Sequence, residues 1–216
     1  MKILALDSSG LVASVAITEE DNLIAEYTVN YKKTHSQTLM PMLQAIKDTV
    51  ELDLESIDAI AIAAGPGSFT GLRIGSATAK GLGLALGKPL VEVPTVAGLA
   101  YNLWGSDKMV CPIMDARRNQ TYTGIYTFER DGENCRMITI KDQCAVDITE
   151  ILTELNHLGQ EVVFLGDGVP VFSDKIREML QVPYTFAPAH CNRQRAGAVA
   201  ALASVYYAEG KMVDAG

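Results

Sequence analysis

The stretch "IAIAAGPGSFTGLRIGSATAKGLGLALG" (Ile60–Gly87) joins an apolar run, a glycine-rich turn and a long helical pattern. The apolar run belongs to "IDAIAIAA", which lacks the alternation of a half-exposed strand and so predicts a strand covered on both faces. A glycine turn at the start of a helix offers N–H groups and a positive dipole end to an anion. The stretch therefore raises the question of whether its glycines serve phosphate binding.

Two specific phosphate motifs do not match the turn. "GSFTGLR" lacks the lysine and the hydroxyl that a P-loop requires. The dinucleotide fingerprint needs Gly-x-Gly-x-x-Gly, whereas Gly65, Gly67 and Gly71 leave one residue too many. Three strands also precede the turn, where a dinucleotide-binding fold would begin with it. We therefore do not expect a nicotinamide cofactor.

The helix after the turn carries glycines along one face. Gly71, Gly75, Ala79 and Gly83 recur every fourth residue, and each helical glycine costs roughly 1 kcal/mol relative to alanine. Such a cost is consistent with a close approach of another backbone. Two interpretations are open: a helix enclosed by its own chain, or a protein–protein contact that includes the helix before it. We expect the second, with the small residues facing another subunit.

The order of the elements indicates a duplicated fold. "MKILALDSS", "LVASVAIT" and "NLIAEYTVNY" predict three strands with short, antiparallel connections. A helix over 34–51 with a Thr34–Gln37 capping box follows. Ser68 and Thr70 are both expected to cap the helix over 70–86, with Thr70 as the better N-cap. The second half repeats β-β-β-α-β-α, with Asp7 and Asp115 each ending a first strand. This predicts a two-lobe α/β fold of the actin-like, ribonuclease H-like type (the ASKHA class).

We expect the lobes to cover residues 1–106 and 107–216, with a boundary near 105–108 and a last helix over 194–209 that packs on the first lobe. A helix is also expected near 147–157, capped by Asp147 or Thr149.

Composition bounds the function. The 216 residues carry a net charge of −8, so tight binding of nucleic acid by the chain alone is not expected. Four separated cysteines without a Cys-x-x-Cys pair suggest neither a zinc site nor a disulfide framework. No stretch has the length of a signal-peptide core or a membrane span, so we expect a cytoplasmic protein without membrane contact.

Four segments together resemble one family: "LALDSS", "THSQTLMPML", "GPGSFTGLRIG" and "DARRNQTY". With a looser "LGDG" at 165–168, they resemble the TsaB (YeaZ) family, paralogues of the TsaD/Kae1 subunit in bacterial tRNA threonylcarbamoyladenosine synthesis. The most specific of these stretches is "GPGSFTGLRIG".

The resemblance implies a subunit without catalysis or cofactor. In that system TsaD transfers threonylcarbamoyl to adenosine 37 of ANN-decoding tRNAs and holds its metal through a His-x-x-x-His motif. Here the matching helix has His35 but Leu39 in place of a second histidine, which argues against a metal. The implied partners are TsaD in a heterodimer, TsaE through the complex, and a second copy when the chain is alone. An ATP or ADP is expected only in the assembled complex.

The family pairs through the two first-lobe helices. The residues expected at this partner interface are His35, Ser36, Leu39, Met42, Leu43, Ile46, Gly71, Arg73, Ile74, Gly75, Ala77, Thr78 and Gly81.

A different class remains open: a small actin-like ATPase or phosphotransferase. The duplication would place two acids across a cleft, which is how actin-like kinases hold Mg-ATP. A vestigial cleft of this kind would comprise Asp7, Ser8, Ser9, Asp115, Gly166 and Gly168. Against this, Leu11 follows "DSSG", and Arg117 and Arg118 stand where a phosphate turn needs glycine; these arginines are instead expected to bond the Asp115 turn or a partner's acid. Ser68 lies outside a Gly-x-Ser-x-Gly elbow, so a peptidase is not expected.

Overall fold

The computed structural model describes residues 1–31 and 34–216, which fold into two compact units. The first unit comprises residues 1–98 and 194–216, and the second comprises residues 99–193. Each unit is described here by itself. None of the helices in the described ranges combines the length and apolar character needed to span a bilayer.

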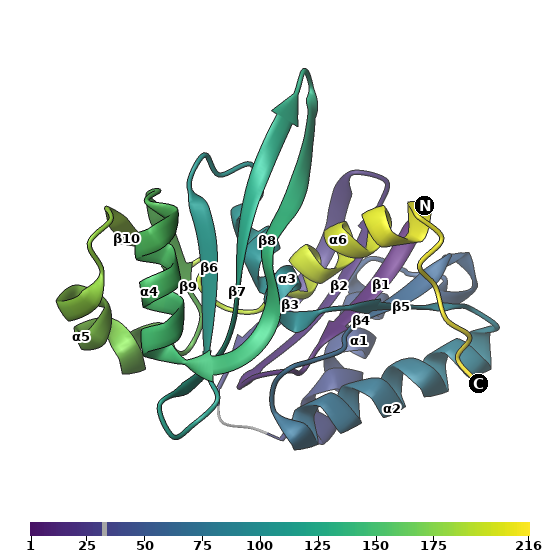
Figure 1. The fold of residues 1–216 in the computed structure, drawn as a ribbon. Helices are drawn as coiled ribbons and strands as arrows, with labels where there is room; N and C mark the ends of the chain where they lie inside the picture. Colours follow the sequence, from purple (N-terminus) through teal and green to yellow (C-terminus); the bar gives the residue numbers. More distant parts are fainter. Residues whose placement is uncertain (32–33) are drawn as a thin grey trace. The chain divides into compact units, whose positions relative to one another are not determined.

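The first unit contains a mixed sheet with helices on both faces (Figure 1). Its elements are β1 (Lys2–Asp7), β2 (Val12–Glu19), β3 (Asn22–Asn30), α1 (His35–Thr49), a 3-10 turn (Leu54–Ser56), β4 (Ala59–Ala63), α2 (Phe69–Leu86), β5 (Leu90–Val93) and α6 (Ala196–Ala208). The sheet order is β3-β2-β1-β4-β5. β1 pairs with β2 antiparallel and with β4 parallel.

The second unit repeats this plan. Its elements are a 3-10 turn (Tyr101–Leu103), β6 (Met109–Asp115), β7 (Gln120–Asp131), β8 (Asn134–Asp147), α4 (Ile148–Leu158), β9 (Val162–Leu165), α5 (Val169–Met179) and β10 (Tyr184–Phe186), with α3 (Thr95–Ala100) at the junction of the units. The order β8-β7-β6-β9-β10 repeats that of the first sheet strand for strand. The prediction of a duplicated actin-like α/β fold is therefore confirmed. β10, a strand of three residues, was not predicted.

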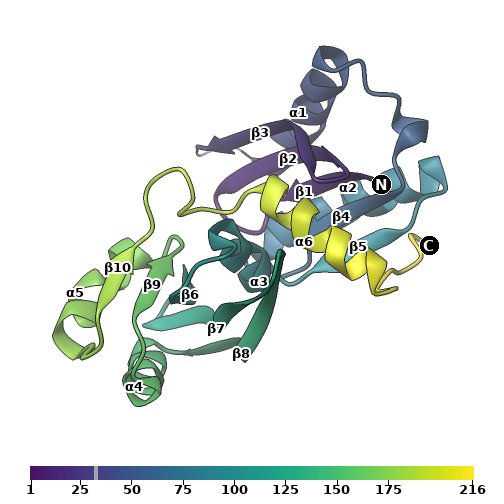
Figure 2. The same ribbon diagram turned by 90° about the horizontal axis from the view of Figure 1, so that it is seen from above.

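Both faces of β1 are covered, as the sequence pattern of the inner strands requires. Leu4 and Leu6 join the apolar cluster beneath α1 and α2, while Ile3 and Ala5 alternate toward the other face. Figure 2 shows α6 lying across that other face, where it contacts β1, β2 and β5. In the second unit α4 and α5 pack side by side, α4 against β7 and β8 and α5 against β6, around a second cluster.

The helix caps differ in part from those expected. Asp147 caps α4 by accepting from the backbone N–H of Thr149 at 2.9 Å, as predicted. For α2 the cap is Ser68, whose hydroxyl accepts from the N–H of Gly71, and Thr70 lies inside the helix. Thr34 occupies the N-cap position of α1 without a side-chain cap bond, so the capping box was wrong.

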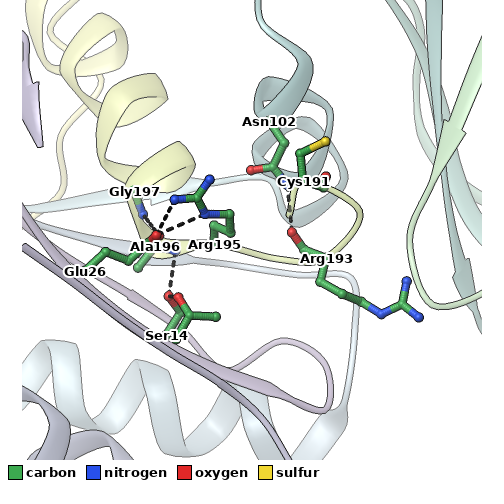
Figure 3. A network of polar contacts seen from close by, with 9 residues as sticks. Ser14, Glu26, Asn102, Cys191, Arg193, Arg195, Ala196 and Gly197 are labelled. Carbon is green, nitrogen blue, oxygen red and sulfur yellow. Dashed lines mark hydrogen bonds and ion pairs between the residues drawn. The ribbon is translucent and has the colours of Figure 1, made fainter. Parts of the chain in front are cut away.

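The N-terminus of α6 is tied to β2 and β3 by side chains (Figure 3). The backbone N–H of Ala196 donates to Oγ of Ser14 at 2.9 Å, and that of Gly197 donates to Oε1 of Glu26 at 2.9 Å. The guanidinium of Arg195 pairs with the other oxygen of Glu26. Two strand side chains thus satisfy helix N–H groups that would otherwise lack partners.

These bonds explain why the units divide differently from the expected lobes. The last helix lies in the first unit, as expected, although about 100 residues separate it from β5 in the chain. The second unit therefore ends at residue 193 rather than 216. The structure also places the other division between residues 98 and 99, within α3, rather than between 106 and 107.

Replacement of Glu26 by alanine should destabilise the protein measurably. The side chain of Glu26 is 10% exposed, and its loss leaves the Gly197 N–H and the Arg195 guanidinium without their acceptor. We expect the free energy of unfolding to fall by about 2–3 kcal/mol in urea denaturation. Glu129→Ala, which breaks an exposed pair with Arg136, should change little. Equal effects of the two variants would contradict this role for Glu26.

Candidate docking surface

The glycine face of α2 is directed at its own chain. Gly71, Gly75, Ala79 and Gly83 are all buried in the first unit. A Cβ at Gly71 would lie 2.1 Å from the carbonyl oxygen of Ser8, and one at Gly83 would lie 2.7 Å from Cβ of Ala215. The expectation that these small residues receive another subunit's backbone is therefore corrected. They admit the β1–β2 loop and the C-terminal segment of the same chain.

The apolar face of α1 is also internal. Leu39, Met42, Leu43 and Ile46 are each at most 5% exposed and belong to the core cluster of the first unit. These four residues, together with Gly71 and Gly75, are withdrawn from the expected partner interface. The physical reason is that α1 needs its apolar stripe to cover β2 and β3.

The remaining residues of the expected interface divide into two groups. Ser36, Arg73, Ala77 and Gly81 are exposed. His35, Ile74 and Thr78 are partly buried, and each has an intramolecular role: Ile74 packs against the core cluster, and Thr78 bonds the carbonyl oxygen of Ile74. The side chain of His35 turns to the β1–β2 loop, where Nε2 donates to the carbonyl oxygen of Gly10 at 2.8 Å.

The outward side of α2 carries apolar residues that were not among the expected interface residues. Phe69 is 69% exposed and Leu84 is 63% exposed, and Met40 on the neighbouring α1 is 48% exposed. The guanidinium of Arg73 lies 3.9 Å from the centroid of the Phe69 ring. The spacing of 69, 73, 77, 81 and 84 would have revealed this stripe, because it lies opposite the glycine face.

Gly81 stands out among the glycines of α2. A Cβ at Gly81 would meet nothing within 4 Å, so the packing of this chain does not require a glycine there. α1 and α2 contact each other and cover the same face of the sheet, so their outward sides adjoin. We define the α1–α2 docking face by seven of the exposed residues of these helices, which are Ser36, Met40, Phe69, Arg73, Ala77, Gly81 and Leu84; the exposed Lys80 adjoins them. An exposed apolar surface of this kind is typical of a protein–protein contact.

The glycine turn before α2 is occupied by its own chain. The N–H of Ser68 donates to the carbonyl oxygen of Ser9 at 2.7 Å, and the hydroxyl of Ser8 donates to the carbonyl oxygen of Gly71 at 2.9 Å. A Cβ at Gly67 would lie 2.2 Å from the oxygen of Ser9. Gly67 is thus explained by contact with the Ser8–Ser9 loop, and Gly65 by its φ of 106°, rather than by a phosphate.

Asp7 is engaged within that same loop. Its Oδ1 accepts from the N–H of Ser9 at 2.9 Å and from the hydroxyl of Ser9 at 2.6 Å. The residue is 2% exposed, and burial raises the pKa of its carboxyl, opposed by the bonds from Ser9 and the nearby His35. The raised pKa means that folding disfavours the ionised carboxyl, which is the form that binds a magnesium ion.

Asp7→Asn should leave the fold at least as stable as the wild type at pH 7. The amide oxygen accepts both bonds from Ser9, and no buried charge remains. Because the pKa is raised on folding, the contribution of Asp7 to stability is greatest at acidic pH and is lost as pH rises through the folded value. Urea denaturation between pH 4 and pH 8 should therefore favour the asparagine variant increasingly as pH rises. A loss of stability at pH 7 would contradict this.

The acids of the second unit also have local partners. Oδ1 of Asp115 accepts from the N–H of Arg117 at 2.8 Å, and its other oxygen pairs with the Arg117 guanidinium at 3.2 Å. Arg117, Arg118 and Asn119 all have φ between 54° and 68°. The backbone N–H of Asp115 donates to Asp167, whose carboxyl pKa is raised by burial.

The second glycine turn has a packing reason of its own. A Cβ at Gly166 would lie 2.1 Å from the carbonyl oxygen of Ile113, and one at Gly168 would lie 2.8 Å from the Ile113 side chain. The turn therefore lies directly on β6. Within residues 1–31 and 34–216, no three His, Cys, Asp or Glu side chains are grouped so as to hold a metal ion.

The paired sheets and their strand order define an α/β protein of the two-lobe actin-like class. A glucomannokinase from Arthrobacter shares the fold at a TM-score of 0.53, with 10% identity over 97% of this chain and 99% of that one. The structure of YeaZ from Pseudomonas aeruginosa is much closer, with a TM-score of 0.80, 26% identity, and coverage of 100% of this chain and 97% of that one.

Sequence comparison then identifies the family. The chain is 34% identical to the tRNA threonylcarbamoyladenosine biosynthesis protein TsaB of Bacillus subtilis, over 83% of this chain and 77% of that protein. It is 32% identical to TsaB of Escherichia coli, over 82% and 76%. Residues 22–213 match the family model described as TsaD, tRNA N6-adenosine threonylcarbamoyltransferase. The chain belongs to the TsaB (YeaZ) family of tRNA threonylcarbamoyladenosine biosynthesis.

Proposed function

We propose that this chain is a non-catalytic accessory subunit that binds TsaD through the α1–α2 docking face. In that complex it supports the transfer of threonylcarbamoyl to adenosine 37 of ANN-decoding tRNA. The observation that carries the proposal is the exposed apolar stripe of α2, with Phe69, Leu84 and a Gly81 that internal packing does not require. The names of the relatives support the pathway, which is tRNA threonylcarbamoyladenosine biosynthesis.

The same surface is suited to a second copy of this chain as well as to TsaD. A small residue at positions 77 and 81 allows a helix of another subunit to approach closely, and the flanking Phe69 and Leu84 supply apolar area. When TsaD is absent, a second copy of the chain covers the face. TsaE joins the assembly through the complex rather than through this chain alone.

The alternative, an actin-like ATPase acting through Asp7 and Asp115, has less support. Asp7 is buried and bonded to Ser9, Asp115 is bonded to Arg117, and the glycines of both turns have packing roles. Nucleotide, if present, then belongs to the assembled complex. The site does not support peptidase activity, because the hydroxyl of Ser68 caps α2 by accepting from the N–H of Gly71.

The proposal is tested by reconstitution. TsaD and TsaE, an ANN-decoding tRNA transcript and a threonylcarbamoyl donor are incubated with and without this chain, and modified nucleoside is measured by mass spectrometry. We expect product only when TsaD and this chain are both present, and no ATP hydrolysis by the chain alone. Full modification without the chain, or magnesium-dependent hydrolysis by the chain that Asp7→Asn abolishes, would overturn the proposal.

A further inference from the structure

A separate cavity of about 290 Å³ lies in the second unit, along one side of α5. We call it the α5 pocket. It is bounded by β9, α5, β10 and the segment that follows β10, and its lining includes Phe164, Val169, Pro170, Phe186, Arg177 and Arg193. Figure 1 shows α5 and β10 next to each other at this end of the unit. The proposed docking of TsaD does not use this pocket.

Aromatic rings form one wall. Phe164 and Phe186 occupy matching positions on the parallel pair β9–β10, so their side chains fall on the same face of the sheet. Their ring centroids lie 6.3 Å apart, and Tyr184 packs against both rings. Phe164 is fully buried, whereas Phe186 is 36% exposed at the mouth. Phe186, held in place by Phe164 and Tyr184, thus offers its ring to a ligand at the mouth of the pocket.

The charged groups of the lining are both arginines. Nη1 of Arg193 donates to the carbonyl oxygens of Gly166 and Asn192 at 2.8 and 3.0 Å, which fixes its position. Arg177 reaches the pocket from the last turn of α5 and pairs with Asp174 at 3.0 Å, a pair in which both side chains are largely exposed. Asp167 lies near Arg193, but no carboxylate is part of the lining.

We propose that the α5 pocket binds a small aromatic carboxylate. The ring lies against Phe186, with Val169 and Pro170 opposite, and the carboxylate is held by Arg177 and Arg193. The planar guanidinium matches a carboxylate in a two-point contact, which a neutral amide does not reproduce. An aliphatic ring in place of the aromatic ring would lose the stacking contact. The volume suits one or two fused rings and is too small for a dinucleotide.

The test is a titration of the full ¹⁵N-labelled chain with 2-naphthoate, followed by amide chemical shifts. We expect saturable shifts confined to residues around 164–177 and 186–193, with a Kd on the order of 1 mM, as befits a ligand of this size. 2-Naphthamide and inorganic phosphate at the same concentrations should each bind at least about fivefold more weakly, because each lacks one of the two recognised features.

Variants locate the contacts. Arg177→Gln and Phe186→Ala should each raise the Kd about tenfold, and Arg177→Lys should recover only part of the loss. The matched control is Arg136→Gln, which removes an exposed, ion-paired arginine far along the chain on β8 and should leave the Kd unchanged. The amide spectrum of each variant reports its fold. No shifts in the α5 pocket at 10 mM naphthoate, or equal binding by naphthamide, or an unchanged Kd in Arg177→Gln, would overturn the proposal.

Discussion

Ala77→Glu is expected to abolish binding of this chain to TsaD while the chain itself stays folded. Ala77 is exposed at the centre of the stripe formed by Phe69, Arg73, Gly81 and Leu84, so in a complex its side chain becomes buried. A carboxylate taken out of water there without a partner should lower the affinity by about 100-fold or more. Calorimetric titration against TsaD measures this directly, and production of modified nucleoside should fall in parallel.

Two comparisons make that result specific. Ala201→Glu places the same charge at an exposed position of α6, on the opposite face of the sheet, and should leave the affinity unchanged. Ile74→Glu is a poor probe, because Ile74 packs against the core cluster and its loss changes stability as well as binding. If Ala77→Glu bound TsaD as tightly as Ala201→Glu, the α1–α2 docking face would be excluded as the contact.

Gly71→Ala should destabilise the first unit strongly, and Gly81→Ala should stabilise it. The added Cβ at position 71 meets the Ser8 carbonyl oxygen at 2.1 Å, and this backbone also positions Ser9, which accepts from Ser68. The loop must therefore move, at a cost of about 3 kcal/mol or more. At position 81 the Cβ meets nothing within 4 Å, so alanine contributes about 1 kcal/mol through helix propensity.

Urea denaturation of the two variants gives the free energies of unfolding, and binding to TsaD gives a second readout. Gly81→Ala should weaken binding by about tenfold although it stabilises the free chain, because the methyl group keeps the partner's backbone away. Gly71→Ala as stable as the wild type would contradict the inward orientation of the glycine face. Gly81→Ala with unchanged affinity would show that the partner does not approach this part of α2.

The sequence predicted which residues share a face of α2, but not what lies against that face. The four-residue spacing of Gly71, Gly75, Ala79 and Gly83 correctly identified one side of a helix. Periodicity carries no information on whether the neighbour is the same chain or another, and here it is the Ser8–Ser9 loop and Ala215. The sequence pattern indicated the outward stripe of α2 less clearly, because polar and small residues separate Phe69 from Leu84.

The strand order of the first unit could be predicted because short links force antiparallel neighbours. The repeated order of elements then predicted the same arrangement for the second unit. β10 was missed because Tyr184–Phe186 is too short to show alternation and is stabilised mainly by pairing with β9. The sequence predicted that the last helix packs on the first lobe, but not the contacts that hold it there. These contacts involve Glu26 and Ser14, which lie 171 and 182 residues before their partners on the helix, and no local pattern reveals them.

The central claim is that TsaD covers the exposed side of α2. It is tested most directly by the rate at which a maleimide alkylates Ala77→Cys, in a chain whose partly exposed Cys135 and Cys144 are replaced by serine. With saturating TsaD the rate should fall at least about tenfold, while a cysteine in place of the exposed Asp174 on α5 should react at the same rate with and without TsaD. An unchanged rate at position 77 in a demonstrably formed complex would contradict the account.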